Sequence, residues 1–595
     1  MKKNTQHLVP FTYLFFLLWS LTAYSQGFQW LQNGGGNNAI DLGNSYFSKE
    51  QVIDIVTDSQ RNVYVISIIS KDGAMIDGNA VTTFETNATN CDFVLASYTC
   101  DGTYRWHKIF GGGSTEYPSG VEVDSQDNVY VIGFFAECDV TTDLYYATAR
   151  IGDTNGIDYT SANTPTSCQR TFLAKFNSNG LFQWIHYPYS PTDNFPYALH
   201  PFSSRNFYIV NDNIYWIASI PPGSYEGGAF SNTNTTLPFL YYLLHYDTSG
   251  NFISAIPFDL ELSGSTSAEL RWYRNPYNGY FYAIYLNNTT NAITVTAGGN
   301  TLTYDLPKII CFNQLGQYQW HREPSGSQFT FSSIDFDPNN NTYITGSCNN
   351  FIPHSFLGWN LPGSNTGVAS YLMKCNPDMS SYSWVTNHSP GSSKPGTQIL
   401  YTPSKIVFTG AINQSVLTWG SQTQVGPGPN NTFDPLLAFF EPSNGDCMSL
   451  HRIVGTNTYD DAFTEIHQDA AGDLILGGFM GLDLTDSNTV QHFTSGGNTD
   501  FFVTKFATES CQALSTASFE VATIQAFPNP AKAQVQLTIA ENYEYTLYNL
   551  LGTVVQKGTL TPQENILSIN DLSKGCYLLE LKNTTSLQRL KILKE

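Results

Sequence analysis

The chain has 595 residues and a formal net charge of -22, with 14% aromatic but only 13% charged residues. This acidic balance excludes nucleic acid as a partner and disfavours anionic lipid headgroups, because phosphates need a basic surface. The 47 glycines, many aromatic residues and few helix formers are typical of short strands joined by tight turns, so the expected fold class is all-β.

The first 25 residues have the features of a signal peptide. Two lysines precede the apolar stretch 11–21, and Ala23 and Ser25 are small residues at the positions that a signal peptidase reads. We expect cleavage after Ser25, with Gln26 as the first mature residue. The apolar stretch is too short to span a bilayer, and no other stretch reaches the ~20 apolar residues of a transmembrane helix. No transmembrane segment is therefore expected.

Two signatures alternate between residue 26 and residue 510. The first is an apolar strand, a turn with Gly and an aromatic strand, with Trp at 106, 184, 320 and 384. The second is an Asp followed by a polar residue four positions later and a strand, at 58, 124, 337 and 469, with weaker copies at 213–218, 279–283 and 405–410. Each recurs roughly every 60 to 80 residues, which predicts about four strands per repeat. Seven copies predict a seven-bladed β-propeller.

The ends of this region predict how the ring closes. The last copy of the first signature, 500–506, lacks its Gly and Trp, whereas Phe28-Gln29-Trp30 has no partner strand near it in the chain. We expect the two segments to form one blade, because an open array would leave an edge strand with unpaired N–H and C=O groups.

The repeat resembles the bacterial seven-bladed propeller repeat family that is often found beside type IX sorting domains. The resemblance is carried by Asp-x-x-x-Asn-x-Tyr-x-x-Gly, by Phe-Val-x-Lys-Phe and by the turn Gly-x-x-x-Trp. We interpret the recurring positions as structural: Asp and Asn side chains bond the turn backbone, and the Trp side chains fill the space between blades.

The C-terminal segment 524–595 has alternating apolar residues, which predict a small immunoglobulin-like β-sandwich after a linker at 511–523. Its motifs are Pro528-Asn529-Pro530, a turn at Gly552, a strand with Gly575 and Tyr577, and a basic-apolar end with Lys591 and Lys594. In this order they resemble the type A C-terminal sorting domain of the type IX secretion system of Bacteroidetes. The resemblance implies a secreted or outer-membrane surface protein that is handled by the type IX machinery and its sorting protease.

Ten cysteines in an exported chain predict disulfides. The first candidate pair is Cys138 with Cys168, because they bracket an insertion that has no counterpart in the other repeats. Further candidates are Cys91 with Cys100 and Cys447 with Cys511.

No zinc-binding His pair, nucleophile elbow or phosphate-binding loop is found, so no catalytic residue and no cofactor is assigned. The oxygen-rich turns 337–341 and 177–179 are the places where calcium would bind.

The long polar insertions 137–169, 221–238 and 415–434 favour a non-catalytic binding or adhesion module with an extracellular glycan or protein ligand. The alternative is an extracellular propeller enzyme that acts on glycans or peptides through acidic residues at the central channel. A structural surface protein without a small ligand is the third hypothesis. Two carboxylates and an Arg at the channel mouth would favour the enzyme, and exposed aromatic side chains on the loop face would favour a binder.

Overall fold

The computed structural model describes residues 26–595, except for a set of internal segments. These segments are 38–48, 85–90, 113–115, 137–147, 162–168, 189–205, 221, 234–238, 264–269, 287–293, 303–304, 350–352, 362–367, 389–392, 414–415, 428–431, 457–458, 486–490, 495, 497–498, 509–510, 512–523, 525, 540, 550–552 and 584–586. Ala23, Ser25, Cys138, Cys168 and Gly552 therefore lie outside the described residues. The chain divides into two compact units, 1–511 and 512–595.

Strands make up nearly all regular structure, and the 3-10 turn Glu226–Gly228 is the one helical element among the described residues. The expected all-β class is therefore confirmed. Over the same residues, no helix is long and apolar enough to cross a membrane.

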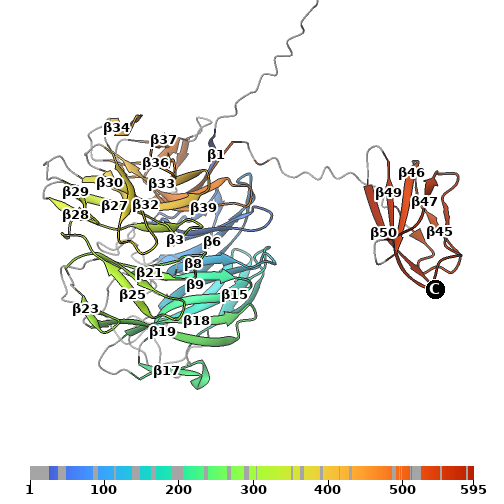
Figure 1. The fold of residues 1–595 in the computed structure, drawn as a ribbon, viewed down its shortest axis with the longest axis horizontal. Helices are drawn as coiled ribbons and strands as arrows, with labels where there is room; N and C mark the ends of the chain where they lie inside the picture. The colour runs from blue at the N-terminus through green and yellow to red at the C-terminus, as the bar shows by residue number, and fades with distance from the viewer. Residues whose placement is uncertain are drawn as a thin grey trace, which may run out of the picture. The chain divides into compact units, whose positions relative to one another are not determined.

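The described residues of the first unit form eleven antiparallel sheets. Seven of these follow one another in chain order, and each of the seven contains a core of four strands (Figure 1). Sheet 1 is β2 Val52–Thr57, β3 Val63–Ser70, β6 Cys91–Tyr98 and β7 Tyr104–Gly111; sheet 2 is β8 Tyr117–Val123, β9 Val129–Ala136, β12 Gln169–Phe176 and β13 Phe182–His186; sheet 3 is β14 Phe207–Val210, β15 Asn213–Ile220, β18 Phe239–Asp247 and β19 Phe252–Ser263. Sheet 4 is β20 Leu270–Arg274, β21 Phe281–Tyr285, β24 Lys308–Phe312 and β25 Tyr318–Arg322; sheet 5 is β26 Ser333–Phe336, β27 Thr342–Asn349, β30 Val368–Cys375 and β31 Tyr382–Asn387. Sheet 6 is β32 Ser393–Thr402, β33 Lys405–Ile412, β36 Asp434–Phe440 and β37 Cys447–Arg452; sheet 7 is β39 Ala462–Gln468, β40 Leu474–Met480, β43 Asp500–Ala507 and β1 Gly27–Gly35.

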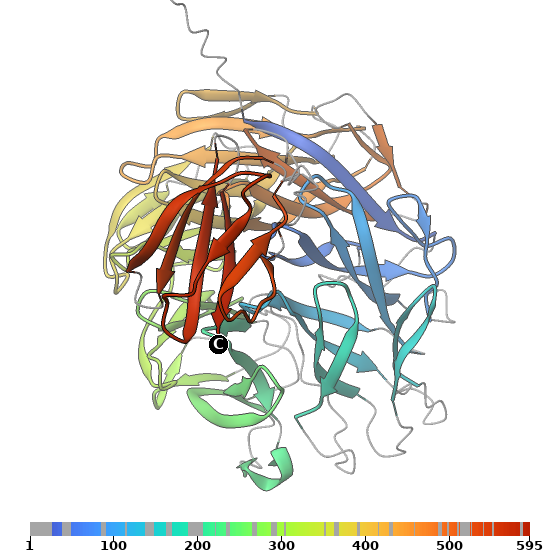
Figure 2. The same cartoon turned by 90° about the vertical axis from the view of Figure 1, so that its right-hand side faces the viewer.

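The predicted pairing of the two end segments is confirmed, because β1 pairs with β43. Phe28 lies opposite Phe506 and Trp30 opposite Lys505, so β1, the first described strand, completes the last sheet (Figure 2). The hydrophobic core lies between neighbouring sheets: Val52 and Val65 of sheet 1 pack in one cluster with Val503 of sheet 7. Sheets 7 and 1, at the two ends of the repeat region, thus share one hydrophobic cluster.

Every connection between the second and third strands of a sheet contains a short hairpin. The hairpins are β4 Met75–Ile76 with β5 Asn79–Ala80, β10 Arg150–Asp153 with β11 Gly156–Thr160, β16 Gly223–Tyr225 with β17 Phe230–Asn232, β22 Thr294–Ala297 with β23 Asn300–Leu302, β28 His354–Phe356 with β29 Trp359–Leu361, β34 Val416–Trp419 with β35 Gln422–Val425, and β41 Asp483–Thr485 with β42 Gln491–Phe493. Each buries at least one apolar side chain, namely Ile76, Ile151, Tyr225, Val295, Phe356, Leu417 and Leu484.

This regularity corrects one expectation. The insertion bracketed by Cys138 and Cys168 was expected to lack a counterpart, but its hairpin β10–β11 occupies the position that a hairpin occupies in all seven sheets. Strands of two to five residues are too short to show a period in the sequence, so the repeat was not recognised. β10 pairs with β7 of the preceding sheet, and β4 pairs in the same way with β1.

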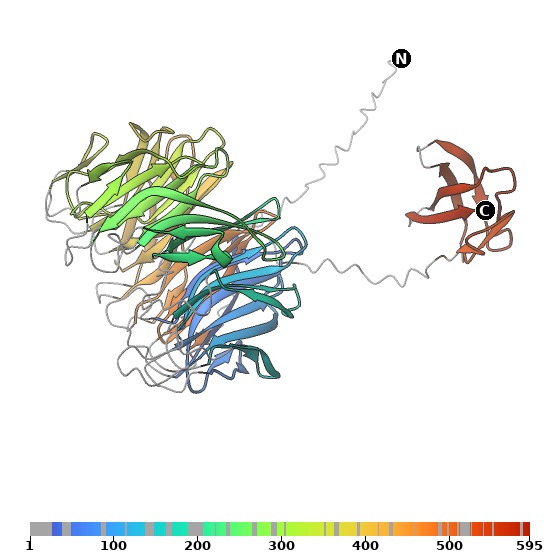
Figure 3. The ribbon, with the colours of Figure 1, turned by 90° about the horizontal axis from the view of Figure 1, so that it is seen from below.

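The second unit consists of two small antiparallel sheets (red in Figure 3). One contains β44 Ala526–Phe527, β45 Gln534–Leu537 and β48 Ile566–Ser568, and the other contains β47 Val554–Leu560, β46 Tyr543–Asn549, β49 Gly575–Lys582 and β50 Leu587–Lys594. Val535 and Leu537 of the first sheet and Leu579 and Leu581 of the second form one buried core. The alternation seen in the sequence therefore corresponds to one buried face per strand.

Candidate functional site

The recurring Asp organises the turn between the first and second strands. Asp58 Oδ1 accepts hydrogen bonds from the backbone N–H groups of Gln60 (2.9 Å) and Asn62 (2.8 Å). Its Oδ2 accepts from the Asn62 side chain (2.7 Å) and from the Tyr64 hydroxyl (2.8 Å). Asp124 and Asp337 make the same set of bonds in sheets 2 and 5. The structural interpretation of this signature is confirmed.

In sheets 5 and 7, a Lys on the third strand forms an ion pair with the recurring Asp of the same sheet. Lys374 Nζ lies 3.3 Å from Asp337 Oδ2, and Lys505 Nζ lies 3.0 Å from Asp469 Oδ2. Burial alone would raise the pKa of Asp469, but hydrogen bonds and charge from Arg61 and Lys505 outweigh it and lower that pKa. These carboxylates are ionised turn anchors and are not poised as general acids.

The Trp and Gly of the first signature interlock across neighbouring sheets. Trp106 of sheet 1 donates from its indole to Ser178 O (3.1 Å), and a Cβ at Gly180 would lie 2.6 Å from the Trp106 ring. Trp30 packs in the same way on Gly102, and Trp384 packs on Gly445. Each Gly also has a positive φ. The signature therefore encodes contact between sheets, as the sequence predicted.

The first strands are hydrogen-bonded to one another from sheet to sheet. Asp54 accepts from the backbone N–H of Val121 (3.0 Å), and Asp335 accepts from that of Tyr401 (2.6 Å). Gln398 donates to Glu465 (3.0 Å). Each of these three bonds holds neighbouring sheets together.

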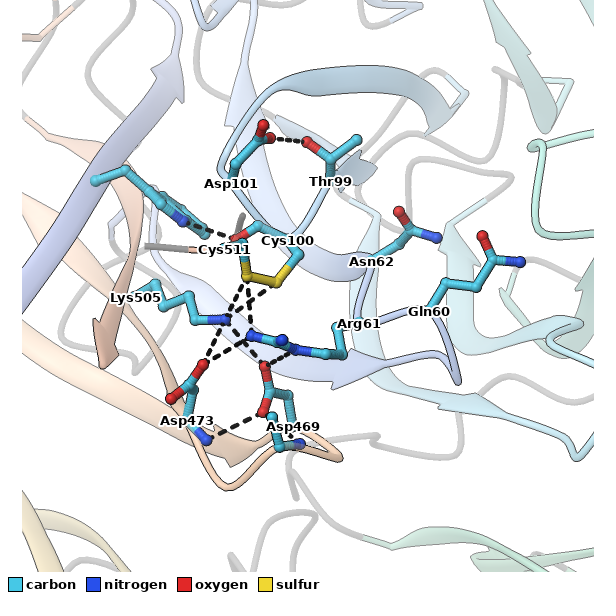
Figure 4. The surroundings of a disulfide bond; sticks show 12 residues. Gln60, Arg61, Asn62, Thr99, Cys100, Asp101, Asp469, Asp473, Lys505 and Cys511 are labelled. Carbon is cyan, nitrogen blue, oxygen red and sulfur yellow. Dashed lines mark hydrogen bonds and ion pairs between the residues drawn. A yellow bond between two sulfur atoms is a disulfide. The ribbon is translucent and has the colours of Figure 1, made fainter. Parts of the chain in front are cut away.

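The seam between sheets 7 and 1 carries a disulfide and four charged side chains (Figure 4). Cys100, in the β6–β7 turn of sheet 1, is bonded to Cys511, which follows β43. Arg61 pairs with Asp469 (2.9 Å) and with Asp473 (2.7 Å). Lys505 reaches the same two carboxylates (3.0 and 2.9 Å). A covalent bond and an ion-pair network thus join the two ends of the repeat region.

This bond overturns two disulfide expectations. Cys100 pairs with Cys511, so neither is bonded to Cys91 or Cys447, and both of these side chains are buried. The correct pair is separated by 411 residues, and only the closure of the repeat region brings it together.

Pairs of buried acidic side chains occur at three junctions and were missed in the sequence. A Cβ at Gly35 would lie 2.4 Å from Asp500 Oδ1 and 2.9 Å from Glu50 Oε2. Gly111 and Gly112 face Asp92 and Glu116 in the same way, and Gly455 faces Asp461 and Asp434. The glycines leave room for these carboxyl groups, and the consecutive glycines at 34–36 and 111–112 were the available signal in the sequence.

We predict that Asp461→Asn stabilises the first unit at neutral pH. Burial, together with the nearby Asp434, Asp483 and Asp460, raises the pKa of Asp461 to about 9. Because the unfolded value is ~3.9, the folded protein keeps a proton that the unfolded chain releases, and stability falls as pH rises from about 4 to about 9. The Asn variant should gain on the order of 3 kcal/mol at pH 7 and little at pH 4.

Urea unfolding at pH 4 and pH 7 measures this effect, and Asp446→Asn on an exposed turn is the control. An equal stability difference at both pH values would contradict a protonated Asp461.

The hairpins of sheets 6 and 7 expose a group of apolar side chains. Val416 pairs with Val425, and Arg452 donates to Val425 O (2.9 Å). β38 Val454–Gly455 follows Arg452 and pairs with β41, which pairs with β42. We call the exposed residues of this region the hairpin patch: Val416, Val425, Val454, Tyr459, Leu482 and Phe493.

In the second unit, Asn529 joins the two ends of the predicted sorting signal. Its side chain donates to Lys591 O (2.6 Å) and accepts from the backbone N–H of Leu593 (2.8 Å). The peptide bonds before Pro528 and Pro530 are cis. Lys594 bonds Lys532 O. The entry motif and the basic-apolar end, far apart in the sequence, therefore form one structure.

Two other residues of the predicted sorting signal, Gly575 and Tyr577, lie on β49, which pairs with the C-terminal strand β50. Gly575 begins β49, and Tyr577 of β49 is buried and donates from its hydroxyl to Ser573 O (2.7 Å).

We predict that Asn529→Ala frees the C-terminal strand. Loss of the two bonds should cost about 1 kcal/mol, because both backbone groups can then bond to water. Amide hydrogen exchange at Leu593 should accelerate, whereas Asn542→Ala, an exposed control on the same unit, should leave it unchanged. Unchanged exchange in Asn529→Ala would show that the bonds do not hold β50.

In the turns named for calcium, the side-chain oxygens of Asp337 and Asn177 already have partners. Asp337 Oδ2 accepts from Asn341 (2.8 Å) and pairs with Lys374, and Asn177 Oδ1 accepts from the backbone N–H groups of Asn179 and Leu181 (both 3.0 Å). Within the described segments, no group of three or more His, Cys, Asp and Glu side chains is arranged to hold a metal ion.

Taken together, the repeated sheets and the separate tail define an all-β repeat protein with a C-terminal sandwich-like unit. Residues 525–595 match the family described as a secretion system C-terminal sorting domain. The tail therefore supports a substrate of the type IX secretion system and indicates export to an extracellular or cell-surface location. No curated protein sequence matches the chain.

Three solved structures are distantly similar. One is a NanB sialidase variant from Streptococcus pneumoniae, with 7% sequence identity, a TM-score of 0.33, and a match that covers 78% of this chain and 69% of that chain. The second is a member of the duf4221 family from Bacteroides vulgatus, with 9% identity, a TM-score of 0.28, and coverage of 65% of this chain and 92% of that chain. The third is a glycoside hydrolase family 32 protein from Bifidobacterium adolescentis, with 9% identity, a TM-score of 0.23, and coverage of 81% of this chain and 79% of that chain. At these identities and TM-scores they transfer neither fold nor activity to this chain.

Proposed function

We propose that the chain is a secreted, non-catalytic binding or adhesion protein in which a seven-bladed β-propeller, 26–510, is exported by an immunoglobulin-like sorting tail, 524–595. The seven sheets would be the blades, and β1 would close the ring. Residues 1–25 would be removed as a signal peptide after Ser25. The sorting protease of the type IX system would remove the tail within or near the 511–523 linker.

The observation that carries the binding role is the hairpin patch. Exposed apolar side chains that gather on neighbouring elements are typical of interaction sites, and two aromatic residues, Tyr459 and Phe493, belong to the patch. The patch lies on the connections between the core strands, which is where variation in a repeat protein creates specificity. The ligand would be an extracellular glycan or protein.

A glycan and host-protein array probed with the purified chain 26–595 tests this proposal. Phe493→Ser should weaken any binding found at least tenfold, whereas Leu315→Ser, equally exposed (62% against 59%) on a β24–β25 turn, should not. Turnover of a glycoside or peptide by the purified protein, lost on substitution of a single first-strand carboxylate, would favour the alternative enzyme.

A further inference from the structure

The seam disulfide is surrounded by positive groups. Lys505 Nζ lies 2.9 Å from Cys511 Sγ and 3.1 Å from Cys100 Sγ, and Arg61 Nη2 lies 2.9 Å from Cys511 Sγ. Both cations are fixed by Asp469 and Asp473 on the side away from the sulfur atoms (Figure 4). The Lys505 side chain is fully buried, so bulk water does not hydrate its ammonium group.

This arrangement has a chemical consequence. Neighbouring cations and N–H donors stabilise a thiolate and lower its pKa, and a thiolate of low pKa leaves a disulfide faster. Cys511 faces two cations and Cys100 faces one, so Cys511 is the better leaving group. Both cysteines are partly exposed, which gives an external thiol access to the bond.

We propose that Cys100–Cys511 is an exchange-active disulfide that a dithiol opens, and not an inert staple. A thiolate of the dithiol attacks Cys100 Sγ, the bond to Cys511 breaks, and Cys511 leaves as a thiolate held by Lys505 and Arg61. The second thiol of the dithiol then attacks the dithiol sulfur that is bonded to Cys100 in the mixed disulfide, and Cys100 is released. The dithiol is thereby oxidised by two electrons to a disulfide, and the two cysteines are reduced.

Opening would release the chain after β43 from the turn of sheet 1. Cys511 is the last residue of the first unit, so this bond is the covalent anchor from which the linker to the second unit starts. Trp30 donates to Cys100 O (3.1 Å), which links the state of the disulfide to the turn that receives β1. The chemical class of partner is a dithiol oxidoreductase or a small dithiol.

The test uses the mature full-length protein, dithiothreitol as the probe, and alkylation with mass spectrometry to count free Cys100 and Cys511. Arg61→Gln should slow opening at pH 7 about tenfold, because the leaving thiolate loses one of its two cations. Arg322→Gln is the matched control: its guanidinium bonds Met379 O (2.7 Å) across another junction, with no sulfur bond. It should open at the wild-type rate.

A second measurement follows the Cys511 thiol of the reduced wild-type protein. After reduction, the alkylation rate of Cys511 should follow a pKa clearly below the ordinary ~8.5, and this pKa should rise in Arg61→Gln. A Cys511 thiol in the reduced wild-type protein that titrates at ~8.5 or above would overturn the proposal, as would equal opening rates in wild type and a folded Arg61→Gln.

Discussion

A chain that lacks residues 26–35 should fail to form a stable first unit. β1 pairs along most of β43, and without it β43 presents a free edge of N–H and C=O groups that invites aggregation. The deletion also removes Leu31, which is 2% exposed, and the Trp30 ring that packs on Gly102. Loss of a buried Leu side chain alone costs ~2–5 kcal/mol.

Thermal unfolding and size-exclusion chromatography of the deletion variant measure the effect. We expect a melting temperature lowered by many degrees, or soluble aggregates. A synthetic peptide of residues 26–35 added during refolding should restore part of the stability, because it can pair with the exposed edge. A monomeric deletion variant with unchanged melting temperature would contradict closure by β1.

Truncation after Cys511 should abolish export while the first unit stays folded. The shortened chain keeps β43 and the Cys100–Cys511 bond but loses the segment 525–595 that matches the sorting domain. The type IX machinery then has no tail to recognise, so the protein should accumulate in the periplasm.

Cell fractionation and protease accessibility on intact cells check this outcome, with the full-length chain as the positive control. Circular dichroism of the retained protein should show the same strand content and melting behaviour as the first unit, which separates loss of export from misfolding. Surface or medium levels equal to those of the full chain would show that the tail is not the export signal.

The repeat and the closure were predictable because they depend on local patterns. All seven copies of the second signature fall at the second strands of their sheets, since the Asp turn uses residues only a few positions apart. The Gly turn and the Trp are likewise encoded within one hairpin, although the Trp contacts the next sheet. The incomplete signatures at the two ends were sufficient to predict that β1 pairs with β43.

By itself the sequence determined the all-β class, the repeats, the completion of sheet 7 by β1 and the sorting tail, because each depends on residue types at short and regular spacings. Only the tertiary structure decided the partner of Cys100, the acidic pair Asp434 and Asp461, and the bonds from Asn529 to the last strand. Each of these contacts joins groups from different sheets or from the two ends of a unit. The distances between these groups depend on how the strands pack in three dimensions, and the periodicity of the sequence does not predict this packing.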